Sequence, residues 1–526
     1  MSKRLLITVF ISVSLFALVL AITPFYLNNW FITTPDAGGL ACAAETLIKT
    51  GHFSDGQTAG LGYNFNVCWT KEMYPVLQIV MASLLWLAPA LHWLVVPITT
   101  VIMFVFCVFG LQIFAWRLTK SVSATLFIGI FASTAPMLLR PLILTPQNVF
   151  GYALIIVVLI ILHELHLRQR ALQPRWWLWL LGMLALLMLG ATHTLSFGIT
   201  GIVMAIWFFA IYLKSWKYRL VLLGGGAVLV GAVLALNVLP ISLTQIWAMF
   251  HGGLSGYDHP LYDHPAIWGY IATSLAAVGI FMAPNALKLE KKTYWFLLVW
   301  LLVPLLLGHV SWFGLTLLPD RFIAFTWISI TVFAGLGLVA LIKRVRFPLP
   351  LLVGFVTLLL GAQTIHAITY CKDDVMGWSD RFQPHAEFIE ALSWLNQQPS
   401  RGTLIGIMAV ANREITFAPI WYDGPVASYP WYNLNHKNIK SFKANSSLYK
   451  TIFAEPQSAE YLRVEAFYTI ITKPNSAEAK TAAQQYNLSY LILPIDSQAG
   501  KIWQKAAPEQ FTLIYENTNY HIYQLQ

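Results

Sequence analysis

The arginines and lysines of the first 370 residues fall into small clusters between long apolar segments. Positive charge beside membrane-spanning helices stays on the cytoplasmic side. The clusters therefore mark cytoplasmic turns, and the loops between them, which hold nearly all the acidic residues of this region, face outward. The clusters are Lys3/Arg4, Arg117/Lys120, Arg168/Arg170/Arg175, Lys214/Lys217/Arg219, Lys288/Lys291/Lys292 and Lys343/Arg344/Arg346.

The composition agrees with a membrane protein. The chain is 57% hydrophobic and 11% charged, against about 25% charged residues in an average soluble domain. The net charge of +10 belongs to the cytoplasmic turns, so it predicts no nucleic-acid partner. Apolar segments of about 20 residues can cross the bilayer as helices. The sequence predicts eleven crossings, near residues 5–24, 95–115, 123–139, 149–165, 176–192, 195–213, 220–240, 266–284, 293–308, 323–341 and 348–367.

The stretch 73–116 decides which side each later loop faces. It is apolar enough for two crossings, but two would place Arg117 and Lys120 outside. We therefore predict that Glu72–Trp93 is a helix that lies in or re-enters the outer leaflet, because prolines separate it from the next helix. The N-terminus is then cytoplasmic and the C-terminus extracytoplasmic. The first segment is expected to be an uncleaved signal-anchor.

A second domain is expected from residue 371, where the hydrophobic segments stop. The fold class is thus an α-helical polytopic membrane protein, with about 11 transmembrane helices in residues 1–370, a first outward loop at 25–94, and a C-terminal extracytoplasmic α/β domain at 371–526. Periodicity in that domain predicts helices at Pro384–Gln397 and Ser476–Tyr486, strands at Thr403–Ala409 and Leu488–Pro494, and a hairpin of Phe511–Tyr515 with Tyr520–Leu525.

The cysteines leave the disulfide pairing open. Cys107 lies within a crossing, where packing is its expected role. Cys42 and Cys68 share the first outward loop, on the side of the membrane that permits disulfides. Cys371 is also outside and can compete for either of them.

The first outward loop carries the main candidate for chemistry. Asp36 follows the first crossing by about a dozen residues and precedes a short helix, Ala41–Thr50, which carries Glu45. A carboxylate held at a membrane surface can act as a general base toward a hydroxyl nucleophile. The alternative is that Asp36 caps the helix or starts a turn after Pro35. Glu45 is a candidate for substrate binding on the same helix.

The order of these features resembles a family. Asp36 after the first crossing, the helix Ala43–Phe53 and the segment Tyr74-Pro75-Val76-Leu77, which opens a surface helix, look like the GT-C glycosyltransferases. These are integral-membrane enzymes that take sugars from polyprenyl-linked donors, and they include protein O-mannosyltransferases, aminoarabinose transferases and oligosaccharyltransferase catalytic subunits. In that family the helix after the first loop does not cross. Glu390–Asn396 and Ile514–Tyr523 are similar to parts of the family's outer domain.

The resemblance implies roles for individual residues. Asp36 matches the family's acidic residue of the first loop, the base or acceptor-orienting group. Arg321, after Asp320 at the outer end of a crossing, resembles the residue that grips the donor's lipid phosphate, and guanidinium groups bind phosphate bidentately. The alternative is an Asp320–Arg321 pair at the headgroups. Arg140 is a second candidate. His193 is a weaker one, since a satisfied interfacial histidine is the commoner case.

We expect no metal and no other cofactor. Metal-dependent relatives place acids in the second outward loop, where this chain has Gln147 and Asn148, and hard divalent cations prefer carboxylates. Two Asp-His pairs in the repeat Tyr257–Pro265 can offer transition-metal ligands, but adjacent residues in a proline-broken loop converge poorly on one ion. Trp421-Tyr422-Asp423-Gly424 is similar, though incompletely, to a signature of oligosaccharyltransferases.

The sequence thus predicts a membrane glycosyltransferase that moves a sugar from a polyprenyl-phosphate-linked donor to an acceptor lipid, glycan or protein on the outer face of a bacterial plasma (inner) membrane. The expected partners are this lipid donor, the acceptor and the bilayer. The alternative is a non-enzymatic polytopic membrane protein, such as a transporter or a partner in envelope polysaccharide assembly. Transporters usually carry polar or broken mid-membrane helices and internal repeats. No such repeat is visible here, which favours the enzyme.

Overall fold

A computed structural model describes residues 3–27, 35–53, 74–89, 94–170, 176–211, 263–287, 289–309, 319–345, 348–382, 386–399, 402–409, 426–431, 466–467, 469–486, 488–506, 509 and 511–525. The chain divides into two compact units. We call Met1–Leu27, Thr100–Leu142 and Gln147–Asp374 the helical unit, and Asn28–Thr99, Ile143–Pro146 and Val375–Gln526 the mixed unit. The predicted first outward loop, 25–94, thus lies mostly in the same unit as the C-terminal domain, whereas the boundary predicted at residue 371 placed it with the membrane helices.

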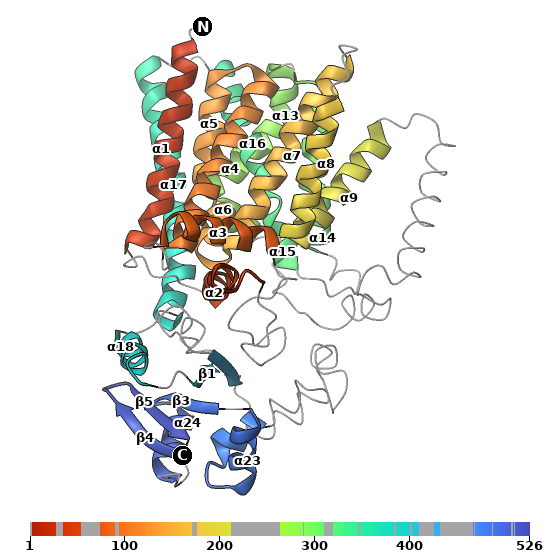
Figure 1. Ribbon diagram of the computed structural model, residues 1–526. Coiled ribbons are helices and arrows are strands. Elements are labelled where there is room, and N and C mark those ends of the chain that lie inside the picture. The colour runs from red at the N-terminus through yellow and green to blue at the C-terminus, as the bar shows by residue number, and fades with distance from the viewer. Residues whose placement is uncertain are drawn as a thin grey trace. The chain divides into compact units, whose positions relative to one another are not determined.

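The helical unit consists of antiparallel apolar helices (Figure 1). Each crossing predicted from the sequence overlaps one helix or two consecutive helices, except 220–240, which lies outside the described residues. The helices are α1 (Lys3–Leu27), α4 (Val95–Thr119), α5 (Val122–Ser133), α6 (Pro136–Leu144), α7 (Pro146–Arg170), α8 (Trp176–Thr192), α9 (Thr194–Ile211), α12 (His264–Trp268), α13 (Tyr270–Ala286), α14 (Lys291–Leu307), α15 (Pro319–Ala324), α16 (Trp327–Arg344) and α17 (Leu349–Phe382).

By length and apolar composition, five of the described helices can cross a membrane, or six if the pair α5 and α6, bent by 47°, counts as one span. Several others, including α8 and α13, are apolar but shorter. The chain is therefore an integral membrane protein with multiple spans, while the predicted total of eleven crossings is not established.

Helix α16 lies at the centre of the helical unit. All of its residues from Trp327 to Ala340 are buried. It packs so closely on α13 that a Cβ atom on Gly279 would collide with the backbone oxygen of Phe333. A Cβ atom on Gly337 would collide with the backbone oxygen of Leu275. Small residues let membrane helices approach this closely and so gain van der Waals packing that lipid tails cannot offer.

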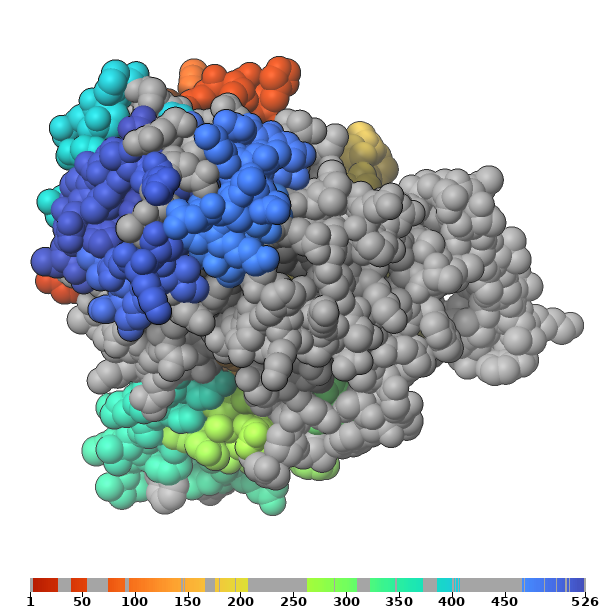
Figure 2. All heavy atoms as spheres, turned by 90° about the horizontal axis from the view of Figure 1, so that it is seen from below, coloured from red at the N-terminus to blue at the C-terminus, as the bar shows by residue number. Residues whose placement is uncertain are grey.

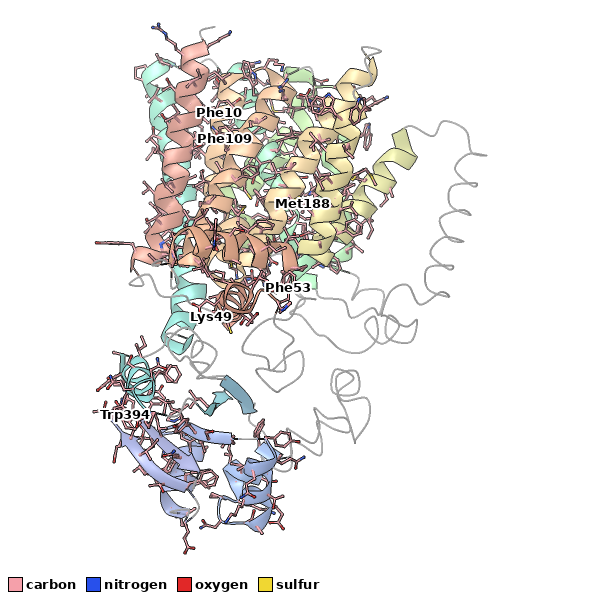
Figure 3. All side chains as sticks on the ribbon, viewed as in Figure 1. Phe10, Lys49, Phe53, Phe109, Met188 and Trp394 are labelled. Atoms are coloured by element: carbon pink, nitrogen blue, oxygen red, sulfur yellow. The ribbon has the colours of Figure 1, made fainter. Side chains whose placement is uncertain are left out.

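An ion pair fixes the relative direction of two helices in this unit. Arg117, near the end of α4, lies 3.2 Å from Glu164 of α7. The two helices therefore end on the same side, which requires an even number of crossings between them. The bent pair α5–α6 supplies one of these crossings, and α7 itself supplies the other. About two turns before Arg117 on α4, Phe109 meets Phe10 of α1 edge to face, with ring centroids 5.3 Å apart (Figure 3).

The direction of every loop is a prediction that reporter fusions check. Fusions after Lys120, Arg219 and Lys292 are expected to report a cytoplasmic location, because these residues belong to basic clusters. Fusions after Asn148, Asp258 and Gln526 are expected to report an external one. A cytoplasmic signal at Gln526 would show that 73–116 crosses twice, and the assignment of the outer site would then be wrong.

The first part of the mixed unit holds two helices that pack on one another, α2 (Pro35–Thr50) and α3 (Pro75–Leu87). Their facing residues include Leu40, Ala44, Leu77 and Met81, all of them buried. Helix α3 has 13 residues, so it spans about 20 Å, less than the roughly 30 Å of hydrocarbon that a crossing requires. Its length fits the prediction of a helix that does not cross.

The second part of the mixed unit contains a five-stranded sheet in the order β2-β1-β3-β5-β4. Strands β1 and β3 are parallel, as are β1 and β2, whereas β5 is antiparallel to β3 and β4. The bounds are β1 (Thr403–Ala409), β2 (Val426–Trp431), β3 (Leu488–Pro494), β4 (Phe511–Glu516) and β5 (Tyr520–Leu525). Every strand predicted from the sequence is present, and β2 is an addition.

Helices cover both faces of this sheet. Tyr490 and Ile492 of β3 pack against α18 (Ala386–Leu395). Leu491 and Leu493 point to the opposite face, toward α23 (Ala477–Gln485) and α24 (Gln498–Ala506). Burial on both faces explains why β3 is a nearly continuous apolar run. Figure 2 shows the atoms of the last residues of the chain, in shades of blue, gathered together. The prediction of a C-terminal α/β domain is thus confirmed as a fold.

Helix α17 runs through the domain boundary that the sequence suggested. Its 34 residues correspond to about 50 Å, and only Leu349–Cys371 is apolar enough to span a membrane. The break in hydrophobicity near Cys371 therefore marks the end of the apolar segment and not the end of the helix, which continues to Phe382.

Candidate functional site

Asp36 lies inside a helix and not at its boundary. Helix α2 begins at Pro35, earlier than the predicted Ala41–Thr50, because proline is well suited to the first helical position. Asp36 is therefore the second residue of the helix, a position at which a negatively charged residue type is favourable. The prediction that Asp36 is the residue that caps the helix is therefore wrong, because the helix begins before it. Whether it acts as a base stays a prediction.

The rest of α2 is anchored. Leu40, Ala41, Cys42, Ala43 and Ala44 are buried, and Cys42 is disulfide-bonded. Because Cys371 and Cys107 form no disulfide, Cys371 does not compete for Cys42, while Cys68 lies outside the described residues.

Glu45 lies on the same helix as Asp36. Its side chain is 14% exposed and lies 3.6 Å from the Lys49 ammonium, one turn later. Ion pairs of this spacing on a helix contribute only about 0.3–0.5 kcal/mol. The pair orients Glu45, and a role of this carboxylate in substrate binding stays a prediction.

In the helical unit, Arg140 lies on the bent segment between two spans. It belongs to α6, which follows the 47° bend after α5, and it is partly exposed. Helix α7 begins directly afterwards at Pro146, with Gln147 buried and Asn148 partly exposed. The segment 140–150, predicted to be the second outward loop, is therefore mostly helical, and it contains one guanidinium and two amide side chains.

Asp320 and Arg321 lie on a separate short helix. The predicted crossing 323–341 corresponds to the candidate span Phe322–Arg344, which contains the end of α15 and all of α16 with a break between them. The turn between these helices is held by hydrogen bonds. The Trp300 indole N–H donates to the Phe325 carbonyl at 3.2 Å, and the Thr326 hydroxyl donates to the Ile323 carbonyl at 2.6 Å. The helix that carries Arg321 is thus fixed at its C-terminal end.

His193 caps helix α9. Its Nδ1 atom accepts a hydrogen bond from the Ser196 backbone N–H at 3.1 Å and lies 2.7 Å from the Ser196 hydroxyl. The side chain is 6% exposed. An imidazole nitrogen in place of the usual cap oxygen satisfies one of the helix's unpaired donors. Its contribution to substrate binding stays a prediction.

The first turns of α7 join these features. A Cβ atom on Gly151 would lie 2.7 Å from the Ser196 hydroxyl and 3.3 Å from Cβ of His193. The next residue, Tyr152, packs edge to face on Phe325 and Trp327, with ring centroids 5.5 and 5.6 Å away. Helix α7 therefore touches the His193 cap and the turn behind Arg321, directly after the segment with Arg140. Asp36 and Glu45 belong to the mixed unit.

The structure also brings together two histidines that the sequence did not link. His264 of α12 and His309, after α14, are 2% and 3% exposed, and their rings lie 4.9 Å apart. His264 also packs on Trp268. Over the described part of the chain, no group of three or more His, Cys, Asp or Glu side chains could hold a metal ion. Most of the Tyr257–Pro265 repeat and Trp421–Gly424 lie outside it.

Comparisons with known proteins identify solved structures that have a similar fold. No family model matches the sequence, and no curated protein matches it either. Solved structures do match over almost the whole chain. The Archaeoglobus fulgidus oligosaccharyltransferase in the apo form has a TM-score of 0.57 at 13% identity, covering 98% of this chain and 74% of its own.

Two further matches are similar in quality. ArnT from Cupriavidus metallidurans bound to undecaprenyl phosphate has a TM-score of 0.57 at 14% identity, covering 99% of this chain and 98% of its own. The mycobacterial arabinofuranosyltransferase AftD has a TM-score of 0.57 at 11% identity, covering all of this chain but only 40% of its own. All three are GT-C glycosyltransferases. The chain therefore has the fold of the GT-C glycosyltransferases, as its first loop and membrane segments led us to expect.

Proposed function

We propose that this protein is a GT-C glycosyltransferase that moves a sugar from a polyprenyl-phosphate-linked donor to an acceptor on the outer face of the membrane. The observation that carries the proposal is a GT-C fold over nearly the entire chain. The match to a structure with bound undecaprenyl phosphate supports a lipid phosphate as the leaving group.

Each step has a group in this chain that suits it. Asp36 accepts the proton of the acceptor hydroxyl or amine, so that the acceptor attacks the anomeric carbon. The bond between that carbon and the phosphate oxygen breaks, and the negative charge stays on the lipid phosphate. Arg321 and Arg140 stabilise this charge by charge-assisted hydrogen bonds. A direct displacement of this kind inverts the anomeric carbon.

Lipid analysis of a deletion strain tests the function. Loss of the enzyme is expected to cause a polyprenyl-phosphate sugar to accumulate, because its consumption stops, and a plasmid copy is expected to restore the normal level. The Asp36→Asn variant on the same plasmid serves as the matched control and is expected not to restore it. An unchanged pool of lipid-linked sugars in the deletion strain would favour a non-enzymatic role.

Chelation tests the expectation that no metal takes part. Treatment of the purified enzyme with EDTA is expected to leave most of the transfer activity intact, because the second outward loop offers amides and no carboxylates. The measurement is the initial rate before and after dialysis against EDTA. A strict requirement for Mn²⁺ or Mg²⁺ would contradict it and would direct attention to Asp258 and Asp263.

A further inference from the structure

One buried amide in the helical unit forms hydrogen bonds to two other helices. Helix α17 is largely exposed along its apolar length: Leu358 and Ile365 are 74% and 67% exposed. Gln363 lies between them on the opposite side and is 1% exposed. A primary amide within a membrane segment is costly unless its polar atoms are bonded. Its inward orientation therefore requires partners inside the helical unit.

Both ends of the amide find such partners, each at a break in a helix. Nε2 of Gln363 donates to the Thr134 carbonyl at 3.2 Å. Thr134 lies between α5 and α6, at the bend. Oε1 accepts from the Ala272 backbone N–H at 3.3 Å. Ala272 lies in the first turn of α13, where N–H groups have no partner within the helix.

The space beside the hydrogen bond between Ala272 and Gln363 admits no residue larger than glycine before α13. The residue before α13 is Gly269, whose φ is 92° and which offers no side-chain cap. A Cβ atom at this position would collide with the Gln363 amide. Gln363 thus takes the place of the missing cap, from a helix 91 residues away in sequence.

A second residue of α17 fixes the same region. Nε2 of His366, nearly one turn after Gln363, lies 2.8 Å from the Ala266 carbonyl on α12. The His366 ring also packs edge to face on Tyr270, with centroids 5.2 Å apart. Gln363 and His366 therefore both hold the link between α12 and α13. Of these bonds from α17, the one from Gln363 to the Thr134 carbonyl is the one that holds the bend before α6.

We propose that Gln363 is a positioning residue for the donor phosphate. It sets the direction in which α6 leaves the bend, and Arg140 lies six residues after Thr134 on that segment. Gln363 would act through Arg140 without touching substrate. The inference rests on the proposed function, because it assumes that Arg140 binds the lipid phosphate. A misplacement of about 1 Å at a binding group is enough to lose much of its contribution.

The test measures binding of undecaprenyl phosphate to the full-length protein in nanodiscs, which requires no transfer activity. Gln363→Met keeps the length of the side chain and removes both hydrogen bonds. Its Kd is expected to rise about tenfold, the order of one lost charge-assisted hydrogen bond. Arg140→Ala is expected to raise the Kd by at least as much. The double variant is expected to bind no more weakly than Arg140→Ala, because both changes remove the same contact.

Thr364→Val is the matched control on α17. The Thr364 hydroxyl donates only to Leu360 of its own helix, so this variant is expected to bind like the wild type. Three results would overturn the proposal: a Kd for Gln363→Met within twofold of wild type, an equal weakening by Thr364→Val, or effects of Gln363→Met and Arg140→Ala that multiply. If Gln363→Met does not fold, Gln363→Asn, which keeps the amide but is one methylene group too short to keep both hydrogen bonds, replaces it.

Hydrogen exchange separates failure of this inference from failure of the proposed function. Gln363→Met is expected to speed amide exchange at the α5–α6 bend and at the start of α13, and to leave α16 protected. If the wild-type chain binds no polyprenyl phosphate, the assigned donor is wrong, and the exchange result alone decides whether Gln363 holds the two breaks. Unchanged exchange at both breaks would refute the positioning role.

Discussion

Asp36→Asn is expected to lower sugar transfer by roughly 100-fold or more, the scale for loss of general-base help, while expression stays normal. The position of Asp36 in the first turn of α2 explains why the fold should survive. A carboxylate there contributes only about 0.3–1 kcal/mol through the helix dipole, and α2 is held independently by its buried face and by the disulfide at Cys42. The measurement is the initial rate at saturating donor, together with the yield and melting temperature of each purified variant.

Asp36→Glu distinguishes the base from a purely helical role. This variant keeps the negative charge in the first turn of α2 but moves the carboxylate outward by one methylene group. If Asp36 only complements the helix dipole, Asp36→Glu will behave like the wild type. If it is a positioned base, transfer will fall sharply although stability is unchanged. Wild-type turnover by Asp36→Asn would exclude the mechanism proposed for this chain.

Arg321→Lys is expected to raise the KM for the lipid donor by about 10- to 100-fold, with a smaller change in kcat. Lysine keeps the charge but loses the planar fork that binds phosphate bidentately, and one hydrogen bond to a charged group contributes about 1.5–3 kcal/mol. The short helix α15 is held at its end by Trp300 and Thr326, so the backbone at Arg321 is expected to stay in place. Initial rates over a range of donor concentrations separate KM from kcat.

Asp320→Asn is the companion that tests the alternative. If Asp320 and Arg321 form only a mutual pair at the headgroups, loss of either charge will have a similar, small effect on both kinetic constants. If Arg321 binds phosphate, Asp320→Asn will leave the donor KM unchanged or lower it, because a nearby negative charge is removed. A donor KM for Arg321→Lys equal to that of the wild type would show that Arg321 is not the phosphate ligand.

The elements that the sequence located well are those whose signal is local. Strands β1 and β3 have the predicted bounds, because each is a short apolar run between turn residues. Helix α23 starts at the predicted position, after its N-cap Ser476, whose hydroxyl accepts a hydrogen bond from the Ala479 N–H. Strand β2, Val426–Trp431, was missed because a short strand that contains Pro430 has a weak periodic signal.

Helix breaks were located less well than helices. The predicted crossing 323–341 agrees with the candidate span Phe322–Arg344 but contains an unpredicted break between α15 and α16, and the predicted helix at Ala41 begins at Pro35. The break at Phe325 and Thr326 depends on a bond from Trp300 of another helix, and such a partner leaves no pattern near the break. The same limit applied to His264 and His309, which lie 45 residues apart in sequence and meet only in the fold.

The sequence by itself determined that this chain is a membrane protein with a C-terminal α/β domain, because hydrophobicity, basic clusters and period-two strands are properties of neighbouring residues. It also identified Asp36, Arg140 and Arg321 as candidates through residue type and order. Only the tertiary structure decided how the segments around them are held. Gln363 bonds to Thr134 across 229 residues and to Ala272 across 91, and a hydrogen bond over such distances depends on how helices pack, which no local pattern encodes.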